Sequence, residues 1–296
     1  NNLAYNFKIG VGADEYVPPV FAADTIIEKV GTDGIVAEEH PVTEQLGAVT
    51  DYRYTGKNPN NYVRFNNELW RIIGVFPTED EYGNIENRIK IIRNESIGDI
   101  QWDNNNINDW STASLQKLLN SGDYYNRTGS YSTNGLTEES KSMIEKAKWY
   151  LGGTSSVSSA SSLVSHWYSY ERGTEVYNER PISYTAEVGL MYPSDYGYAT
   201  GGGSTTNREN CLAKELFYWD DSSYGDCKNN DWLYDSDRSQ WTIIPLSSYS
   251  ISVFYLYYPG IIYNCDALNN VAVRPVVYLN SMVEIIGGEG TVSNPY

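Results

Sequence analysis

Apolar and polar positions alternate along the chain from residue 51 onward, which is the pattern of β-strands with one buried face. Runs of this kind cover residues 51–56, 61–76 and 87–96. Asn66 and Asn67 interrupt the second run with the residue type that two-residue hairpin turns favour. A further turn is expected at residues 82–84, so the pattern predicts an antiparallel meander in this part of the chain.

A helix is predicted over residues 111–120, where the apolar spacing changes from two to three or four. Leu115, Leu118 and Leu119 form an apolar stripe on one face. Asp109 or Ser111 is expected to cap the N-terminus of this helix, because both residue types accept hydrogen bonds from free backbone N–H groups.

A second helix is predicted over residues 138–151, with Thr137 as its N-cap and Gly152 and Gly153 at its end. Its apolar residues would share one face; they are Met143, Ile144, Ala147 and Leu151. Helices gathered between antiparallel strands indicate an α+β fold rather than a parallel α/β sheet.

Two later segments are less regular. Residues 154–165 are rich in serine and predict a loop or the start of a third helix. Residues 187–212 combine a short apolar strand with a long loop of Gly, Ser and Thr. Loops of that length are often functional or mobile.

The first fifty residues differ from the rest and are expected to form an N-terminal appendage, packed on or tethering the main domain of residues 51–296. A short helix is predicted over residues 22–30, ended by Gly31. An acidic connector follows it, with Glu38, Glu39 and Glu44.

The segment from Trp241 to Ser281 is the most aromatic and β-branched part of the chain, and its only charged residues are Asp266 and Arg274. A buried β core is one interpretation, since strands covered on both faces contain little charge. A binding surface is the other. Five tyrosines lie among small polar residues between Tyr249 and Asn270, and alternate side chains of a strand point to opposite faces. That composition is typical of recognition surfaces and favours the second interpretation.

Charge limits the partners of the chain. With 38 acidic and 21 basic residues its formal net charge is −17. This charge disfavours nucleic acid and anionic membrane surfaces, because both are bound through Lys and Arg. The sequence also contains no apolar run long enough to cross a bilayer. We therefore expect no nucleic-acid partner and no direct membrane insertion.

Three cysteines bear on the location of the protein. Cys211 and Cys227 lie close in sequence across a loop, and a short-range disulfide between them is plausible. Such a disulfide would leave Cys265 unpaired. Together with abundant Tyr, Asn, Ser and Gly and few Lys, it favours an extracellular or cell-surface location. Reduced thiols in a cytoplasmic protein are the alternative.

Residues that usually carry catalysis are scarce. His40 and His166 are the only histidines, and no nucleophile elbow, zinc-protease motif, phosphate loop or CxxC pair occurs. His166 is expected to be a packed structural residue. Six aspartates between Asp220 and Asp237 could supply oxygen ligands for Ca²⁺, but their spacing does not match an EF-hand and favours solvated turns. We expect no enzyme activity, no metal and no cofactor.

Seven segments together resemble one group of bacterial proteins. They are NPNNYVRFNNELWRIIGVF (58–76), RIKIIRNESIG (88–98), NDWSTASLQKLLN (108–120), GLMYPSDYGYAT (189–200), CLAKELFYWDDSSYGDCKNNDWLY (211–234), VRPVVYLNS (273–281) and GGEGTVSNPY (287–296). The set resembles surface proteins of gut Firmicutes-type bacteria or their phages. These carry a C-type-lectin-like domain related to the formylglycine-generating enzyme. The resemblance covers about residues 51–296 and implies antiparallel sheets with two main helices and long loops.

Some members of that group are variable proteins of diversity-generating retroelements, in which a reverse transcriptase miscopies adenines of a template. Template Asn codons altered at adenines cannot encode Glu, Gln, Lys, Met or Trp, and these five residue types are absent from residues 242–281. The resemblance therefore implies a variable region over about residues 241–279. Its fixed framework would be Trp241, Thr242, Pro245 and the strand 273–279, with Cys265 the product of a mutable codon.

The same resemblance implies which residues bind the ligand. The variable set would be Tyr249, Ile251, Tyr255, Tyr257, Tyr258, Ile261, Ile262, Tyr263, Asp266, Leu268 and Asn269. We expect a secreted or surface-displayed protein that uses this set to recognise a protein or another macromolecule. A structural subunit or adhesin of a surface appendage is an alternative. A formylglycine-generating-type oxidase would need an active-site cysteine pair, and a calcium-dependent sugar lectin would need a Glu-Pro-Asn or Gln-Pro-Asp motif, which is absent.

Overall fold

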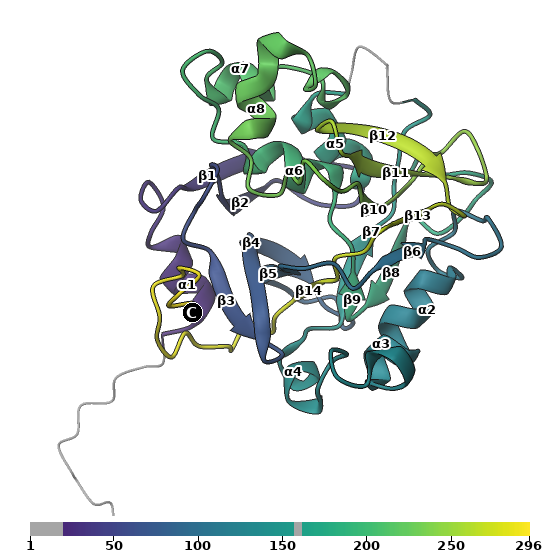
Figure 1. The fold of residues 1–296 in the computed structure, drawn as a ribbon, viewed down its shortest axis with the longest axis horizontal. Helices are drawn as coiled ribbons and strands as arrows, with labels where there is room; N and C mark the ends of the chain where they lie inside the picture. Colours follow the sequence, from purple (N-terminus) through teal and green to yellow (C-terminus); the bar gives the residue numbers. More distant parts are fainter. Residues whose placement is uncertain (1–19, 157–161) are drawn as a thin grey trace, which may run out of the picture.

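The computed structural model of the protein describes residues 20–156 and 162–296, which form three β-sheets surrounded by short helices (Figure 1). The largest sheet has seven strands in the order β1-β2-β4-β5-β14-β9, with β3 also paired to β4, and its pairings are antiparallel. These strands are β1 (Ile35–His40), β2 (Val49–Tyr54), β3 (Tyr62–Phe65), β4 (Glu68–Glu79), β5 (Ile85–Arg93), β9 (Val188–Gly189) and β14 (Val276–Tyr278).

A five-stranded sheet carries most of the aromatic segment that ends at Ser281. Its order is β12-β11-β10-β13-β6, and among the strand pairs that the described residues form in this sheet only β10–β13 is parallel. The strands are β6 (Asp99–Gln101), β10 (Gln240–Pro245), β11 (Ser252–Tyr257), β12 (Ile261–Asp266) and β13 (Asn270–Ala272). A two-stranded sheet joins β7 (Ala147–Tyr150) to β8 (Ser183–Ala186).

The mixture of mostly antiparallel sheets with helices confirms the α+β class. The expectation of two main helices is wrong, because the helices of the described residues are all short. They are α1 (Ala22–Ile27), α2 (Ser114–Asn120), α3 (Asp123–Asn126), α4 (Glu138–Met143), α5 (Val164–Glu171), α6 (Pro193–Ala199), α7 (Arg208–Leu212) and α8 (Gly225–Asn229), with single 3₁₀ turns η1 (Gly129–Tyr131), η2 (Leu216–Tyr218) and η3 (Ser222–Tyr224). The serine-rich residues 157–161 lie outside the described part of the chain.

The predicted meander is confirmed as β3, β4 and β5. Asn66 and Asn67 form the β3–β4 turn with positive φ angles of 56° and 61°, the conformation that makes Asn favourable in a two-residue hairpin. The turn expected at residues 82–84 joins β4 to β5. Asp80 Oδ1 fixes that turn by accepting hydrogen bonds from the backbone N–H groups of Tyr82 and Asn84.

The helix predicted over residues 138–151 is wrong in its second half. Thr137 caps α4 as expected, because its hydroxyl accepts a hydrogen bond from the N–H of Ser140. The chain then becomes β7, with Ala147 and Trp149 fully buried and Lys148 between them reaching Glu79. Pairing with β8 therefore outweighs helix propensity, and the apolar residues follow a period of two.

The cap of α2 also differs from the prediction. Asp109 accepts a hydrogen bond from the N–H of Ser111 in a turn before the helix, and neither residue caps it. Asp103, which comes earlier in the chain, accepts from the N–H of Ser114, the first residue of the helix. Asp103, eleven residues before Ser114, thus supplies the hydrogen-bond acceptor that an N-cap residue would provide.

Part of the N-terminal segment belongs to the main sheet. β1 pairs with β2 along its whole length, from Ile35 opposite Tyr54 to His40 opposite Val49. α1 ends at Ile27, earlier than the predicted residue 30, and Ala22 donates a backbone hydrogen bond to the carbonyl of Val283. Residues 22–54 are therefore packed into the fold, while residues 1–19 lie outside the described part.

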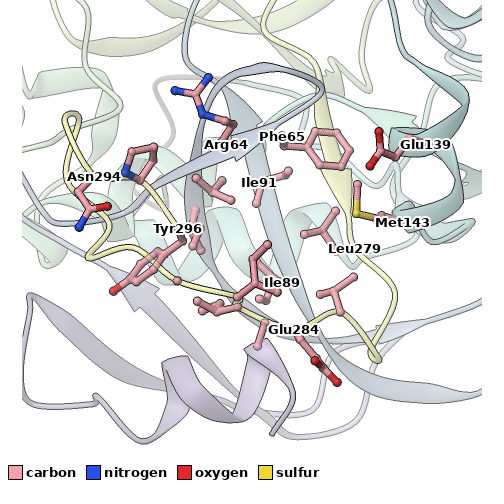
Figure 2. A pocket seen from close by; sticks show the side chains of 18 residues that line it. Arg64, Phe65, Ile89, Ile91, Glu139, Met143, Leu279, Glu284, Asn294 and Tyr296 are labelled. Carbon is pink, nitrogen blue, oxygen red and sulfur yellow. The ribbon is translucent and has the colours of Figure 1, made fainter. Parts of the chain in front are cut away.

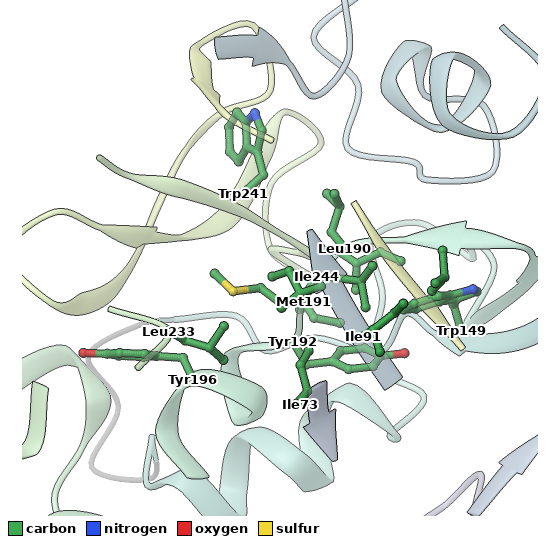
Figure 3. Packing of buried hydrophobic residues seen from close by; sticks show 14 of the residues in the cluster. Ile73, Ile91, Trp149, Leu190, Met191, Tyr192, Tyr196, Leu233, Trp241 and Ile244 are labelled. Carbon is green, nitrogen blue, oxygen red and sulfur yellow. The ribbon is translucent and has the colours of Figure 1, made fainter. Parts of the chain in front are cut away.

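The core lies between the two larger sheets. Figure 3 shows Ile91 of β5, Trp149 of β7 and Ile244 of β10 gathered around Leu190 and Met191. The backbone joins the layers at the same place, since the N–H of Ile243 donates to the carbonyl of Met191. This continuous core makes the five-stranded sheet a rigid base for the side chains on its outer face.

Candidate ligand-binding surface

The β11–β12 hairpin places Tyr255, Tyr257 and Tyr263 on one face of the five-stranded sheet. Its antiparallel register sets Tyr255 opposite Tyr263 and Tyr257 opposite Ile261. The alternate positions, where Leu256 faces Ile262, point to the other side. The hairpin therefore has two faces of different character.

One face of the hairpin is core. Phe254, Leu256 and Ile262 are fully buried. The ring of Phe254 meets the edge of Trp167 on α5, with the ring centroids 4.8 Å apart. Figure 1 shows the hairpin beside α5 and α6, which close this face.

The other face carries a row of aromatic rings that becomes more exposed toward the turn. Trp241 contacts Tyr255, Tyr255 contacts Tyr257, and Tyr257 contacts Tyr258, with centroid distances of 6.0, 5.5 and 4.6 Å. Trp241 is buried, whereas Tyr258 is 49% exposed and Tyr263 on the adjacent strand is 40% exposed. The buried end fixes the row, and the exposed end is free to contact a ligand.

Two aromatic residues from outside the predicted variable region extend this surface. Phe217 in η2 lies 5.8 Å from Tyr263 between ring centroids, and its neighbour Tyr218 is 42% exposed. The disulfide between Cys211 and Cys227 is confirmed, with Cα atoms 5.4 Å apart, and it closes the loop that carries η2. Phe217 and Tyr218 were not predicted from the sequence. Their position between the two cysteines was the available indication.

The aromatic residues that meet here form a surface that we call the tyrosine surface: Phe217, Tyr218, Tyr257, Tyr258 and Tyr263. Its members come from two segments that are distant in sequence but meet at the turn end of the hairpin. It combines large rings with few rotatable bonds, which is the composition that binding surfaces use to bury area at low entropic cost.

The structure divides the predicted variable set by exposure. Six members are exposed, namely Tyr249, Tyr258, Tyr263, Asp266, Leu268 and Asn269, while Ile251 and Tyr257 are half-buried. The expectation of display is wrong for Tyr255, Ile261 and Ile262, which are buried. Ile262 points into the core face of the hairpin, and Tyr255 and Ile261 are covered by neighbours in the sheet.

The exposed members also form two groups at opposite ends of the hairpin. Tyr258 and Tyr263 lie toward the turn, while Tyr249, Leu268 and Asn269 belong to loops at the open end. Six-residue strands at ~3.3 Å per residue separate the two ends by about 17 Å. The loop at the open end is held by Asn108, whose Nδ2 donates to the carbonyl of Tyr249. The sequence-predicted set is therefore two patches.

Cys265 lies on the same side of β12 as Tyr263 and is half-buried. Burial raises the pKa of its thiol to about 12, so the thiol stays protonated and poorly nucleophilic at neutral pH. It is the one free cysteine, since Cys211 and Cys227 are bonded to each other.

The acidic segment from Asp220 to Asp237 uses its carboxylates as local turn acceptors. Asp221 accepts from the N–H of Ser223, Asp226 from those of Thr205 and Thr206, and Asp235 from that of Asp237. Among residues 20–156 and 162–296, no group of three or more His, Cys, Asp or Glu side chains could hold a metal ion. These contacts agree with the interpretation as turns.

A layer of charged residues is buried between the seven-stranded sheet and α6. This layer was not predicted from the sequence. Asp195 of α6 accepts from Lys90 of β5 and from Arg53 of β2, the latter at 3.2 Å. Arg53 also donates to Asp51 at 2.7 Å, and His40 Nε2 lies 3.0 Å from the same carboxylate. All five side chains are at most 5% exposed.

A second buried acid adjoins this layer at the end of α5. Glu171 accepts from the N–H and hydroxyl of Ser194 and from Arg172. The Arg172 guanidinium stacks on Tyr168 at 3.5 Å from the ring centroid. Burial raises the pKa of Glu171 to about 7, and it lowers the pKa of Lys90 to about 8. These groups are buried and paired with one another, so we assign them a structural role. His166, on the same helix α5, is half-buried.

An apolar cavity shares none of its lining residues with the tyrosine surface. It encloses about 620 Å³ between the seven-stranded sheet and the C-terminal segment. Figure 2 shows Phe65, Ile89 and Ile91 on its floor, with Leu279 and Tyr296 beside them. Its walls carry few polar groups, and nothing in the structure indicates what would occupy it.

Comparison with known proteins adds no assignment. No family model matches the chain, and neither a curated protein nor a solved structure shows significant similarity to it. Within the two described ranges, helices that combine the length and the apolar character of a membrane span do not occur.

Proposed function

We propose that this protein is a non-enzymatic binding protein, secreted or displayed on a cell or phage surface, whose tyrosine surface recognises a protein or another macromolecular ligand. The observation that carries the proposal is the contrast between the two faces of the β11–β12 hairpin. On one face Phe254, Leu256 and Ile262 are buried in the core, while Tyr263 on the other face and Tyr258 at the turn are exposed to solvent. Nothing in the packing of the fold requires those rings to be exposed.

The physical basis for binding is the burial of these rings. Four tyrosines and Phe217 offer apolar area and hydroxyl groups on a base that need not rearrange. Tyrosine is among the residues that contribute most to binding at the centre of interfaces, where truncation of one ring costs about 2 kcal/mol or more. A preformed base reduces the entropy lost on binding.

We further propose a C-type-lectin-like fold and diversification by a retroelement, following the resemblance of the seven sequence segments. The variable positions would then be limited to side chains that leave the core intact, such as Tyr258, Tyr263 and Asp266. Tyr255, Ile261 and Ile262 would belong to the framework. The decisive observation is genomic: a near-copy of the DNA encoding residues 241–279 beside a reverse transcriptase gene, differing only at adenines.

The sulfur chemistry supports binding rather than oxidase activity. A formylglycine-generating-type oxidase needs two thiols at its active site, whereas Cys211 and Cys227 form a buried disulfide and Cys265 is the single remaining thiol. A disulfide also fits an extracellular location, because such bonds persist in oxidising compartments.

The test replaces Tyr257, Tyr258 and Tyr263 together by Ala. A partner is first selected with the wild-type protein from a library of bacterial surface proteins and then purified. We expect affinity for that partner to fall by at least about 100-fold, since two or more anchors are lost. The matched control is Tyr82→Ala, which removes an exposed ring from the distant β4–β5 turn and should leave affinity unchanged.

Melting temperature decides between the two interpretations of the aromatic segment. The triple variant should melt within a few degrees of the wild type, because Tyr258 and Tyr263 are exposed, Tyr257 is only half-buried, and such rings contribute little to folding. Unfolding of the variant, or equal loss of affinity in Tyr82→Ala, contradicts a binding role for the tyrosine surface.

A further inference from the structure

A polar cavity of about 530 Å³ lies next to the tyrosine surface. Tyr234 connects the two, because it lines the cavity and its hydroxyl donates to the carbonyl of Tyr258. The wall of the cavity includes Arg71 from β4 and the adjacent residues Asp231 and Trp232, with the exposed Lys57 at the rim. None of these residues is part of the predicted variable set.

The guanidinium of Arg71 is held rigidly in this wall. It lies between two rings, 4.4 Å from the centroid of Tyr62 and 4.4 Å from that of Trp232. Its Nε donates to Asn61 Oδ1 at 2.9 Å, and the amide of Asn61 is fixed in turn by the carbonyl of Ile72. Stacking and one strong hydrogen bond thus leave the outer edge of the guanidinium, Nη1 and Nη2, as its only free side.

That outer edge is not satisfied within the described part of the chain. Nη1 makes one long hydrogen bond of 3.4 Å to the carbonyl of Trp232, and Nη2 has no partner. Arg71 is 7% exposed. Burial lowers its pKa to about 10, so it remains charged at neutral pH. An unpaired buried charged donor is costly, and native proteins contain few of them.

Asp231, in the same wall, has one carboxylate oxygen without a hydrogen-bond partner. Its Oδ1 accepts from the N–H of Leu233 at 2.8 Å, but Oδ2 is buried without a partner. Backbone bridges to Gly56 and Thr200 fix the residue in place. Burial raises the pKa of Asp231 well above its usual range, against the opposing charges of Arg71 and Arg208.

We propose that this cavity is a binding site for a carboxylate group. The planar fork of a guanidinium matches the two oxygens of a carboxylate, and rigid stacking orients that fork in advance. Lys57 at the rim adds a second positive charge. A phosphate dianion fits less well, because the cavity offers one buried cation and an acid rather than a cluster of cations. The site rests on its own geometry and does not depend on the proposed function.

The test uses small carboxylates as probes, followed by NMR of isotope-labelled full-length protein. Titration with N-acetyl-L-aspartate amide should shift the indole signal of Trp232 in a saturable way. The expected Kd is on the order of 1–10 mM, as befits a ligand of this size. Acetate should bind at the same place more weakly, and inorganic phosphate should bind more weakly than the aspartate derivative.

Three variants locate the site. Arg71→Lys keeps the charge but loses the fork, and should weaken binding by about tenfold or more. Lys57→Ala, an exposed substitution that leaves the fold intact, should weaken it by about two- to fivefold. The control is Lys146→Ala, which removes a lysine paired with Glu81 elsewhere on the surface and should change nothing.

Three results would overturn the proposal. The first is the absence of a saturable shift at about 50 mM probe, well above the expected Kd. The second is equal weakening by Lys57→Ala and Lys146→Ala, which would indicate general charge attraction. The third is tighter binding of phosphate than of the aspartate derivative, which would make the cavity a phosphate site. If Arg71→Lys fails to fold, the Lys57→Ala and Lys146→Ala pair still decides the outcome.

Discussion

The charged layer under α6 and the tyrosine surface reverse the usual placement of residue types. The first buries Lys90, Arg53 and Asp195 between a sheet and a helix, while the second exposes the rings of Tyr258 and Tyr263 on another sheet. Charged side chains are rarely buried unless they are paired, and large rings are usually covered. The two regions therefore differ in what a substitution can change: the first determines the fold, and the second is available for contacts.

The physical difference lies in how many partners each residue has. Asp195 accepts from two cations and from the backbone N–H of Tyr192, so its loss leaves several buried groups unsatisfied. The rings of the tyrosine surface contact one another but leave one side to water. Their loss removes contact area without exposing an unpaired charge.

The largest effect is expected from Asp195→Ala. Removing one member of a buried ion pair costs about 3–5 kcal/mol, because Lys90 and Arg53 remain buried without their shared acceptor. Urea unfolding should report this loss in the free energy of unfolding. Glu81→Ala, which breaks the exposed pair with Lys146, should cost less than about 1 kcal/mol. Similar losses in both variants would remove the distinction between the buried layer and the surface.

The next effect compares two neighbours on β12. Ile262→Ala should cost about 2–5 kcal/mol, since it opens a cavity in the core face of the hairpin. Tyr263→Ala should cost under about 1 kcal/mol, because its ring is 40% exposed. Thermal unfolding of the two variants measures the difference. Equal destabilisation would mean that the outer face of the hairpin is core as well.

The smallest effect concerns pH. Because the pKa of Glu171 rises from an ordinary 4.5 to about 7, the folded protein keeps a proton that the unfolded chain releases between these values. The stability that this proton supplies is complete below pH 4.5 and is lost as pH rises through 7. The loss is at most about 3 kcal/mol.

Glu171→Gln tests this pH dependence, because Gln does not titrate. The free energy of unfolding of the wild type should fall more steeply than that of the variant between pH 4.5 and 7.5. Other titrating groups affect both proteins alike and cancel in the difference. Parallel profiles would contradict a proton held on Glu171.

Sequence patterns predicted the local features of this fold well. The β3–β4–β5 meander, the Asn66-Asn67 turn and the Thr137 cap depend on neighbouring residues and were predicted correctly. The disulfide between Cys211 and Cys227 was also correct, since it joins residues that are close in sequence. For the aromatic segment two interpretations were left open, a buried β core and a binding surface; β11 and the start of β12 are mostly buried, while Tyr258 and Tyr263 are exposed.

Features that depend on distant partners could not be predicted. β7 was taken for helix because its pairing with β8 is invisible in its own sequence. α6 was taken for strand and loop, since its Pro, Ser and Gly disfavour a helix, yet Asp195 holds its first turn by accepting from the N–H of Tyr192. Tyr255, Ile261 and Ile262 were wrongly assigned to the displayed set. Their burial depends on the register of β11 and β12 and on packing against α5 and α6, which the local sequence does not reveal.

The charged layer also constrains how this protein can change over evolutionary time. Exchange of Lys90, Arg53 or Asp195 one at a time would pass through an intermediate that loses about 3–5 kcal/mol, a large fraction of the stability of a typical domain. Descendants should therefore keep these residues together or replace them together, so that they covary. The tyrosine surface has no such barrier, and its positions can change independently of one another.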